Sequence, residues 1–378
     1  MITGNKLHTF GAVHSLARRC NHASRGGSMK ILVTGSSGLV GSEAVIHFDK
    51  LGHKVIGIDN NMRAKLFGPQ GDTVWVRNKL LSETKSFHYL DIDIREHEKI
   101  MALFKEERFD VIIHCAAQPS HEKARDIPVT NFEINAVGTL NLLEANRQYS
   151  AEAPFVFMST NKVYGDAPNE IPVKESDTRW DFDAQSYIDG IPESLRIDQS
   201  KHSLFGASKV AADIMVQEYG RYFNMPTVCM RGGCFTGPNH SGVETHGFLS
   251  YLIRCNLEEK EYTIYGYKGK QVRDNLHSYD VVKFIEEYIK SPLAGEVYNI
   301  GGGKKNSISI LDSCRLVESI TGKPMMIKYC NVHRDGDHIC YYSNLSKAQR
   351  DFSNWVVTRN LREMFEEIVK NWETSKKQ

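Results

Sequence analysis

The chain lacks the features that mark membrane, nucleic-acid-binding and disulfide-stabilised proteins. No apolar run approaches the length needed to cross a bilayer. The formal net charge is +1, so no excess of one sign favours nucleic acid or a membrane surface as partner. The eight cysteines are scattered without a C-x-x-C pair, which predicts free, buried thiols in a reducing compartment. We therefore expect a cytoplasmic protein with no membrane or nucleic-acid partner and no bound metal.

Length and composition predict a globular protein with a large core. The chain has 378 residues, of which 41% are hydrophobic and 25% charged. This length suits one large domain and a smaller one. Residues 1–28 contain no Asp or Glu and are expected to form a disordered N-terminal extension. An organellar targeting segment, an upstream start codon and an artificial leader all remain open for it.

Three regularly spaced glycines follow the first strand-like run of the chain. The apolar residues 31–33 lead into Gly35, Gly38 and Gly41, and a helical pattern follows. Gly35 permits a tight turn, Gly38 lets the backbone approach a pyrophosphate, and Gly41 lets helix and strand pack closely. The helix N-terminus would attract the anionic diphosphate. Asp59, which ends the second strand, can accept both ribose hydroxyls of NAD and repel a 2′-phosphate. The pattern predicts NAD binding.

Strand-like and helical patterns alternate from residue 29 to about residue 231. This alternation predicts an α/β protein, a Rossmann-type doubly wound parallel sheet. The long polar stretches 60–86 and 175–202 show little periodicity, so we expect functional or mobile loops at the ligand edge of the sheet. The expected strands are 30–34, 54–59, 87–91, 110–114, 154–159 and 226–231, and the most prominent helices are 132–149 and 203–223.

The regular alternation ends after residue 231, which predicts a smaller C-terminal substrate-binding domain. Its boundaries are expected at 232–378, after an NAD-binding domain at 29–231 with return segments near 273–302. Residues 297–301 have the pattern of another strand of the main sheet. Further elements are expected as helices near 245–257, 307–321 and 359–373 and as a strand at 261–265.

Small and polar residues close the third and fourth strands. Ala116 and Ala117 would let a flat cofactor lie against the backbone, although tight packing alone explains them too. Asp93 and Ile94 could contact the adenine, and the alternative for Asp93 is a helix N-cap.

Two later segments carry candidate catalytic groups. Ser159 and Thr160 end the fifth strand, where a hydroxyl can hydrogen-bond a sugar oxygen as it becomes a carbonyl. Lys209 lies four residues after Phe205, so both would share one face of the 203–223 helix and point toward a cofactor over the sheet edge.

From residue 29 to about residue 375, the chain resembles the extended short-chain dehydrogenase/reductase family, the nucleotide-sugar epimerases and dehydratases. The resemblance implies that Lys209 bonds the nicotinamide ribose, that Thr160 bonds the reacting hydroxyl, and that two arginines hold the nucleotide diphosphate. The matching motifs are Gly35-x-x-Gly38-x-x-Gly41, Asp93-Ile94, Ala116-Ala117, Asn135, Thr160 before Val163-Tyr164-Gly165, Lys209, Gln271-x-Arg273-Asp274, His277, Asp280, Asn299-Ile300-Gly301-Gly302 and Arg334-x-Gly336-Asp337.

The pattern and the resemblance together give a full set of expected contacts. The expected NAD contacts are Gly35, Gly38, Leu39, Val40, Gly41, Asp59, Asn60, Asp93, Ile94, Ala116, Ala117, Gln118, Asn135 and Lys209. The expected substrate contacts are Thr160, Asn161, Cys234, Gln271, Arg273 and Arg334, with Thr160, Lys209 and the position of Phe205 expected to be catalytic.

Asn161 and Lys162 separate epimerisation from dehydration. Sugar 4,6-dehydratases of the family typically carry Asp-Glu here, and a neutral amide and a cation cannot replace that acid and base. The resemblance favours an epimerase that acts at C2 of a CDP-linked dideoxyhexose. It also implies a homodimer in which helices 132–149 and 203–223 pair with a second subunit.

Phe205 and Cys234 depart from the family pattern. The family's general base is a Tyr at the position of Phe205, and a substrate-binding Asn usually occupies the position of Cys234. Three hypotheses follow: an epimerase with another base, a variant that lacks its base, and a protein that binds NAD and a nucleotide sugar without turnover. A reductase or dehydrogenase that releases NADH is a further alternative. The candidate replacement bases are Lys162, Tyr164, Tyr187, His202 and Cys234.

Overall fold

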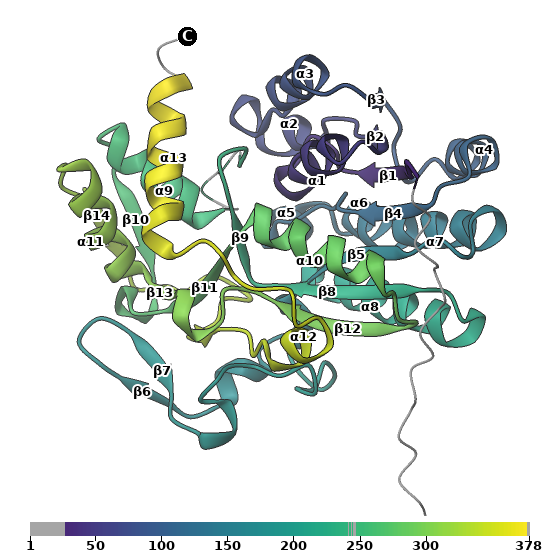
Figure 1. Cartoon of the computed structure of the whole chain (residues 1–378). Helices are drawn as coiled ribbons and strands as arrows, with labels where there is room; N and C mark the ends of the chain where they lie inside the picture. The colour runs from purple at the N-terminus through teal and green to yellow at the C-terminus, as the bar shows by residue number, and fades with distance from the viewer. Residues whose placement is uncertain (1–26, 241, 243, 245–246, 376–378) are drawn as a thin grey trace, which may run out of the picture.

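A seven-stranded sheet forms the centre of the molecule (Figure 1). The computed structural model describes residues 27–240, 242, 244 and 247–375, so most of the expected N-terminal extension lies outside the described residues. Every strand pairs parallel to its neighbours, in the order β12-β8-β5-β4-β1-β2-β3, which confirms the predicted Rossmann-type sheet. The strands are β1 (Lys30–Thr34), β2 (Lys54–Ile58), β3 (Phe87–Leu90), β4 (Val111–His114), β5 (Phe155–Thr160), β8 (Thr227–Gly232) and β12 (Glu296–Ile300).

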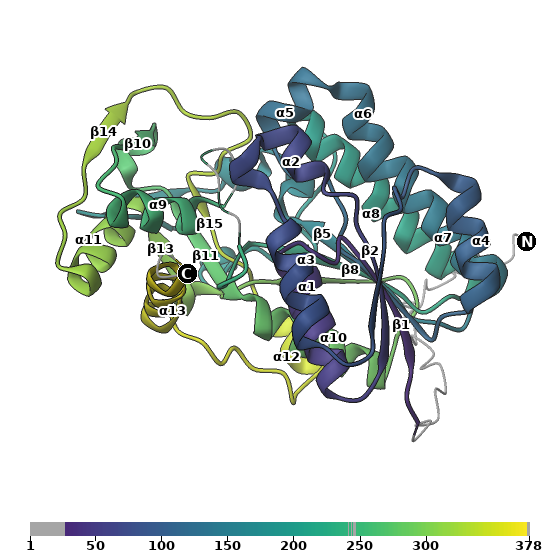
Figure 2. The same ribbon diagram turned by 90° about the horizontal axis from the view of Figure 1, so that it is seen from above.

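Helices cover both faces of this sheet (Figure 2). Successive strand residues point to opposite faces, so Ile31 and Val33 pack into one core and Leu32 into the other. One face is covered by α1 (Leu39–Lys50), α3 (Val74–Glu83) and α10 (Ser278–Lys290). The other face is covered by α4 (His97–Glu107), α7 (Gly138–Tyr149) and α8 (Leu204–Phe223).

The predicted strands begin and end within one residue of the observed ones, but both predicted loops contain regular elements. Residues 175–202 include the short strand β7 (Trp180–Phe182). Residues 60–86 contain α2 (Met62–Phe67) and α3. Val76 and Leu80, four residues apart, are fully buried and attach α3 to the core, although most of the helix is polar. The expected helix at 132–149 is also composite, because α6 (Pro128–Phe132) and a π-helical turn (Glu133–Val137) precede α7.

The smaller elements lie beside the carboxyl ends of the sheet strands. A third core lies between α9 (Phe248–Leu257), α11 (Ile310–Thr321) and α13 (Leu361–Ser375). Residues 296–300 join the main sheet as β12, as the sequence predicts. The remaining elements are α5 (His121–Asp126), α12 (Ser346–Asp351), the hairpin β6 (Val173–Glu175) and β7 (Trp180–Phe182), the pair β10 (Tyr262–Tyr265) and β14 (Ile327–Cys330), and the sheet of β9 (Cys234–Thr236), β11 (Val272–His277), β13 (Ser307–Ser309) and β15 (Cys340–Tyr341). Within the described ranges, no helix has both the length and the hydrophobicity of a membrane span.

A buried ion pair fastens α8 to the sheet. Asp213 of α8 receives hydrogen bonds from Arg231 of β8 at 2.8 and 3.2 Å. Ser159 of β5 donates to the same carboxylate at 2.5 Å. Both charged side chains are almost completely excluded from solvent, 4% exposed for the arginine and 0% for the aspartate.

We predict that Asp213→Asn lowers the free energy of unfolding by about 3–5 kcal/mol, because it leaves Arg231 as an uncompensated buried charge. Denaturant titration followed by circular dichroism measures the change. Glu218→Gln is the matched control on the same helix, since Glu218 pairs with Arg221 at the surface and its loss should cost less than about 0.5 kcal/mol. Equal losses in the two variants would contradict the structural role of the buried pair.

Candidate active site

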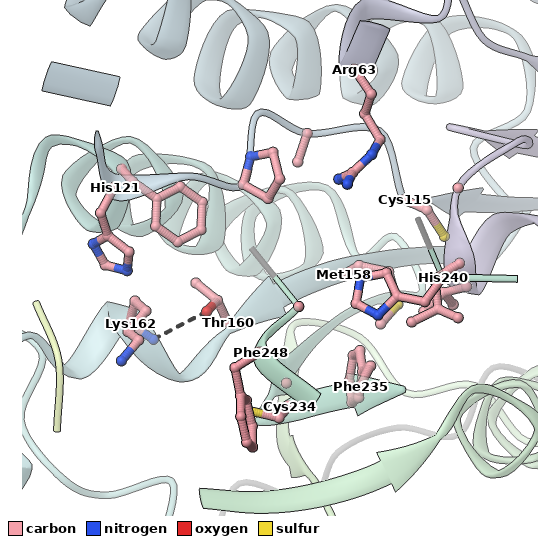
Figure 3. A pocket seen from close by; sticks show the side chains of 18 of the residues that line it. Arg63, Cys115, His121, Met158, Thr160, Lys162, Cys234, Phe235, His240 and Phe248 are labelled. Atoms are coloured by element: carbon pink, nitrogen blue, oxygen red, sulfur yellow. Dashed lines mark hydrogen bonds between the residues drawn. The ribbon is translucent and has the colours of Figure 1, made fainter. Parts of the chain in front are cut away.

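A cavity of about 490 Å³ opens at the carboxyl ends of the sheet strands (Figure 3). Its walls come from the loops after β1, β2, β4 and β5, from the start of α8, and from described residues within 232–240, 247–275 and 334–337. Ligands of open α/β sheets bind at this edge. The cavity is therefore the candidate active site.

The glycine loop forms one end of this cavity. Gly35 has a φ of +65°, and a Cβ there would lie 2.8 Å from the backbone nitrogen of Ala116. A Cβ on Gly41 would lie 2.1 Å from the carbonyl oxygen of Gly35. Gly38 directly precedes α1, so the helix N-terminus faces the space that these glycines leave open.

Asp59 lies beside this loop, at the end of β2. Its carboxylate accepts hydrogen bonds from the backbone N–H groups of Ser37 and Asn61, at 3.0 and 2.8 Å. Burial raises the pKa of Asp59, and these hydrogen bonds oppose the rise. Arg63 extends into the same part of the cavity (Figure 3). Arg63 is absent from the residues predicted to bind ligand, because residues 60–86 have the sequence pattern of an irregular loop.

Thr160 and Lys209 lie near the middle of the cavity. Thr160 ends β5, and its hydroxyl oxygen accepts a hydrogen bond from the backbone N–H of Lys162 at 3.2 Å. The Lys209 ammonium donates to the carbonyl of Met158 at 2.7 Å and lies 4.0 Å from the centre of the Phe157 ring. Burial lowers the pKa of Lys209 to about 8. Both side chains can thus reach a ligand above the end of β5.

Phe205 also lines the cavity, with a histidine against its ring. The His121 and Phe205 ring centres are 5.1 Å apart in an edge-to-face arrangement. Nδ1 of His121 lies 2.6 Å from the hydroxyl oxygen of Ser203, the N-cap residue of α8. His121 is also absent from the predicted residues, although its position shortly after β4 places it at the ligand edge.

The far end of the cavity carries two arginines. Arg273 of β11 is buried and forms an ion pair with Asp337. The Arg334 guanidinium lies 4.3 Å from the centre of the Tyr265 ring. Gln271 donates its amide N–H to the carbonyl of Tyr265 at 3.1 Å. These groups offer positive charge and an aromatic surface to an anionic, ring-containing ligand.

Most residues predicted to bind ligand meet in this cavity. Gln118 and Asn135 do not line it, because they hydrogen-bond each other behind its wall, and a direct contact with NAD stays a prediction for both. The predicted residues that line the cavity are Gly35, Gly38, Leu39, Val40, Gly41, Asp59, Asn60, Asp93, Ile94, Ala116, Ala117, Thr160, Asn161, Phe205, Lys209, Cys234, Gln271, Arg273 and Arg334.

Three of the candidate replacement bases lie outside the lining of this cavity. Tyr164 is fully buried and donates to Asn299 at 2.8 Å, and burial raises its pKa to about 12. Tyr187 packs near Phe182, and the His202 ring lies between two backbone carbonyl oxygens. Lys162 and Cys234 do line the cavity.

The geometry defines a class of protein, and the comparison with known families agrees. The family described as NAD dependent epimerase/dehydratase matches residues 31–301. The chain belongs to this family. NAD is its cofactor, and the cavity fits NAD, since the glycine loop leaves room for a diphosphate and Asp59 stands where an adenosine ribose would lie.

Individual relatives include epimerases and dehydratases. CDP-paratose 2-epimerase of Salmonella typhi is 33% identical over 311 residues, which cover 80% of this chain and 85% of the relative. dTDP-glucose 4,6-dehydratase of Salmonella typhimurium is 30% identical over 307 residues, 78% of each chain. The structure of UDP-glucuronic acid 4-epimerase from Bacillus cereus, in complex with UDP-glucuronic acid and NAD, matches with a TM-score of 0.74 and 25% identity, over 92% of this chain and 100% of that one.

We predict that Gly41→Ala raises the Kd for NAD at least about tenfold, equivalent to about 1.4 kcal/mol. The added methyl group collides with the Gly35 carbonyl and must displace the loop that faces the diphosphate. Isothermal titration calorimetry measures the affinity. Gly27→Ala is the control, because a Cβ at Gly27 has no atom within 4 Å. Unchanged NAD affinity in Gly41→Ala would contradict the assignment of this loop.

Proposed function

We propose that the protein is an NAD-dependent nucleotide-sugar epimerase that acts at C2 of a CDP-linked dideoxyhexose, as a CDP-paratose 2-epimerase does. The observation that carries this proposal is the continuous cavity that joins the glycine loop to Arg273 and Arg334, with Thr160 between them. One end suits a dinucleotide and the other end suits a nucleotide diphosphate. The 33% identity to a CDP-paratose 2-epimerase supports the choice of sugar and carbon.

Each polar group of the cavity has a role in this reaction. Arg273 and Arg334 would hold the substrate diphosphate through charge-assisted hydrogen bonds. The Thr160 hydroxyl would donate to the sugar oxygen as that oxygen becomes a carbonyl. Lys209 would orient the cofactor ribose from α8. Bound NAD supplies the acceptor, and later the donor, of the sugar's hydride.

Inversion requires the oxidised sugar to turn within the cavity before the hydride returns to its other face. The phosphate contacts lie at the end of the cavity farthest from the glycine loop, so the sugar can rotate while the diphosphate stays held. The neutral amide of Asn161 stands beside Thr160 and cannot supply the proton transfers of a dehydration. These features favour epimerisation over loss of water.

Phe205 favours a second candidate function, binding of NAD and a nucleotide sugar without turnover. A phenyl ring cannot accept a proton from the reacting hydroxyl. A lost general base typically costs about 10²–10⁴ in rate. This candidate predicts normal ligand affinity and no change in the sugar.

We predict that the protein converts CDP-paratose to its 2-epimer in deuterated water with no net NADH and no solvent deuterium at C2. The hydride that leaves C2 also returns to it, so solvent protons do not reach the carbon. Nuclear magnetic resonance of the product and absorbance at the NADH band measure both quantities. Accumulation of NADH would instead indicate a dehydrogenase, and an unchanged sugar that still binds would indicate the second candidate.

We also propose a homodimer that forms through α7, α8 and the turns before them. The elements α6, α7 and α8 lie on one side of the molecule (Figure 2). Apolar side chains are exposed along α6, the π-helical turn before α7, and α8. Such a face is typical of an interface between subunits. Its exposed members are Val129, Phe132, Val137, Leu204, Ile214, Tyr222 and Phe223.

We predict that Ile214→Lys shifts the dimer toward monomer and raises its dissociation constant at least about tenfold, because two unpaired charges would be buried in the interface. Sedimentation velocity at micromolar concentration measures the state. Trp75→Lys is the control, since Trp75 is an exposed aromatic on α3, across the sheet. A wild-type monomer at these concentrations would overturn the proposed dimer.

A reducing, cytoplasmic location remains part of the proposal. The seven cysteines that the structure describes are all free, which supports a compartment that keeps thiols reduced. Location of the tagged protein by cell fractionation would test it.

A further inference from the structure

We propose that Lys162 is the general base that replaces the missing tyrosine, and that its amine takes the proton of the reacting sugar hydroxyl. The inference rests on the proposed epimerase function and names the residue that the function requires. Lys162 lies on the turn directly after β5, two residues beyond Thr160. Its backbone N–H donates to the Thr160 hydroxyl oxygen, so the two side chains project from the same rigid turn.

The Lys162 turn is packed against the first turn of the helix that carries Phe205. A Cβ on Gly206 would lie 3.0 Å from the Lys162 carbonyl oxygen, which shows how closely the two segments approach. His121 contacts both Phe205 and the segment around Gly336, which the Lys162 amine also contacts. Its ring packs on Phe205, and it lies so close to Gly336 that a Cβ there would approach it to 2.7 Å. His121 and Lys162 lie close together at one side of the cavity (Figure 3). Phe205, which packs on His121, therefore borders the same part of the cavity as Lys162.

The Lys162 amine makes two hydrogen bonds, so the third position on its nitrogen can face a ligand. Nζ donates to the carbonyl oxygen of Gly336 at 2.9 Å and lies 3.4 Å from Nδ1 of His338. Nε2 of His338 lies 2.9 Å from the carbonyl oxygen of Gly165, so it carries the hydrogen and Nδ1 is the acceptor. A neutral amine can donate these two bonds and keep its lone pair. No other hydrogen bond to Nζ exists among the described residues.

The surroundings of the amine bring its pKa close to physiological pH, so that a fraction of the protein carries the neutral amine. Burial is the main reason that the pKa of Lys162 falls to about 8, and the positive charge of Arg273 lowers it further. A base with a pKa near the working pH is well matched to proton transfer. The titratable and charged groups that face the amine are His121 of α5, Asp166 after the turn, Cys234 of β9, Arg273 of β11, and Asp337 and His338 of the segment before β15.

The other titratable groups of this part of the cavity are poorer bases. Burial raises the pKa of the Cys234 thiol to about 11, so it stays protonated. Burial lowers the pKa of His121 to about 3, which makes its imidazole a weak proton acceptor. Asp337 is held by the Arg273 guanidinium, and attraction to that charge lowers the pKa of its carboxyl group.

The proposed step balances without any further reactant. The Lys162 lone pair takes the hydroxyl proton, and the electron pair of the broken O–H bond becomes the second bond between carbon and oxygen. The same carbon gives up its hydride to the oxidised dinucleotide. On the return, the hydride adds to the carbonyl carbon and the Lys162 ammonium gives its proton back to the oxygen. The amine is thus regenerated in every cycle.

The test begins with the wild-type enzyme and its pH profile. We expect kcat/KM for CDP-paratose to rise with pH up to about 8 and then to level off, because the amine must lose its proton to act as base. Lys162→Met should lower kcat by about 10²–10⁴ and abolish this rise, while the affinities for NAD and CDP change less than about threefold. Lys201→Met is the control, since the Lys201 side chain is 73% exposed and its loss should leave the profile unchanged.

A second measurement needs neither turnover nor a variant. Competitive acetylation followed by mass spectrometry reports the pKa of individual lysines, and we expect Lys162 to titrate near 8. Titration of Lys162 above about pH 10 would overturn the inference. It would also be overturned if Lys162→Met kept the rise of kcat/KM with pH, or if Phe205→Tyr raised kcat about 100-fold or more. The same holds if His121→Asn, and not Lys162→Met, lowered kcat and abolished the rise with pH. If the wild type epimerises no CDP-, dTDP- or UDP-sugar, the proposed function fails first and the inference fails with it.

Discussion

The attachment of α8 to the sheet through Asp213 fixes the relative positions of the groups that matter most in this cavity. The Asp213 carboxylate accepts hydrogen bonds from Ser159 of β5 and from Arg231 of β8, so the helix is held against two strands at once. Ser159 directly precedes Thr160, and Asp213 lies one helical turn after Lys209. A buried charge that is fully paired tolerates little movement, because each lost hydrogen bond leaves a charge in a medium of low dielectric constant. The geometry between a strand end and a helix is therefore set by polar contacts below the cavity.

The main sheet and the glycine loop could be predicted from sequence because their signals are local. Apolar runs such as residues 31–33 define buried parallel strands, and the glycines at 35, 38 and 41 define the turn that follows. The helix α3 could not be predicted in the same way, because only Val76 and Leu80 of its ten residues are buried. Its stability comes from packing on α1 rather than from its own pattern, and a pattern shows no partner. Arg63 lies on the neighbouring helix α2, in the same stretch 60–86 that has the sequence pattern of a loop, so it could not be predicted as a ligand-binding residue either.

The proximity of Lys162, His121 and Gly336 near Phe205 could not have been predicted from the sequence. The contact between Lys162 and Gly336 joins positions separated by 174 residues, and His121 approaches both the start of α8 and the segment before β15. Nothing in the local sequence of any of these segments indicates the others. Sequence could name Lys162 as one of five possible bases, but burial and hydrogen bonding are properties of the folded chain. Those properties separate Lys162 from Tyr164, whose hydroxyl group is turned away from the cavity toward Asn299.

With a diphosphate bound at Arg273, the charges of the cavity would couple substrate binding to the proton affinity of Lys162. In the ligand-free protein the Arg273 charge disfavours a proton on the Lys162 amine. A bound diphosphate would bring negative charge to Arg273 and offset that repulsion. The amine would then become more basic when the substrate whose proton it takes is present. Linkage requires the reverse as well, so a protonated Lys162 would bind the diphosphate more tightly than a neutral one.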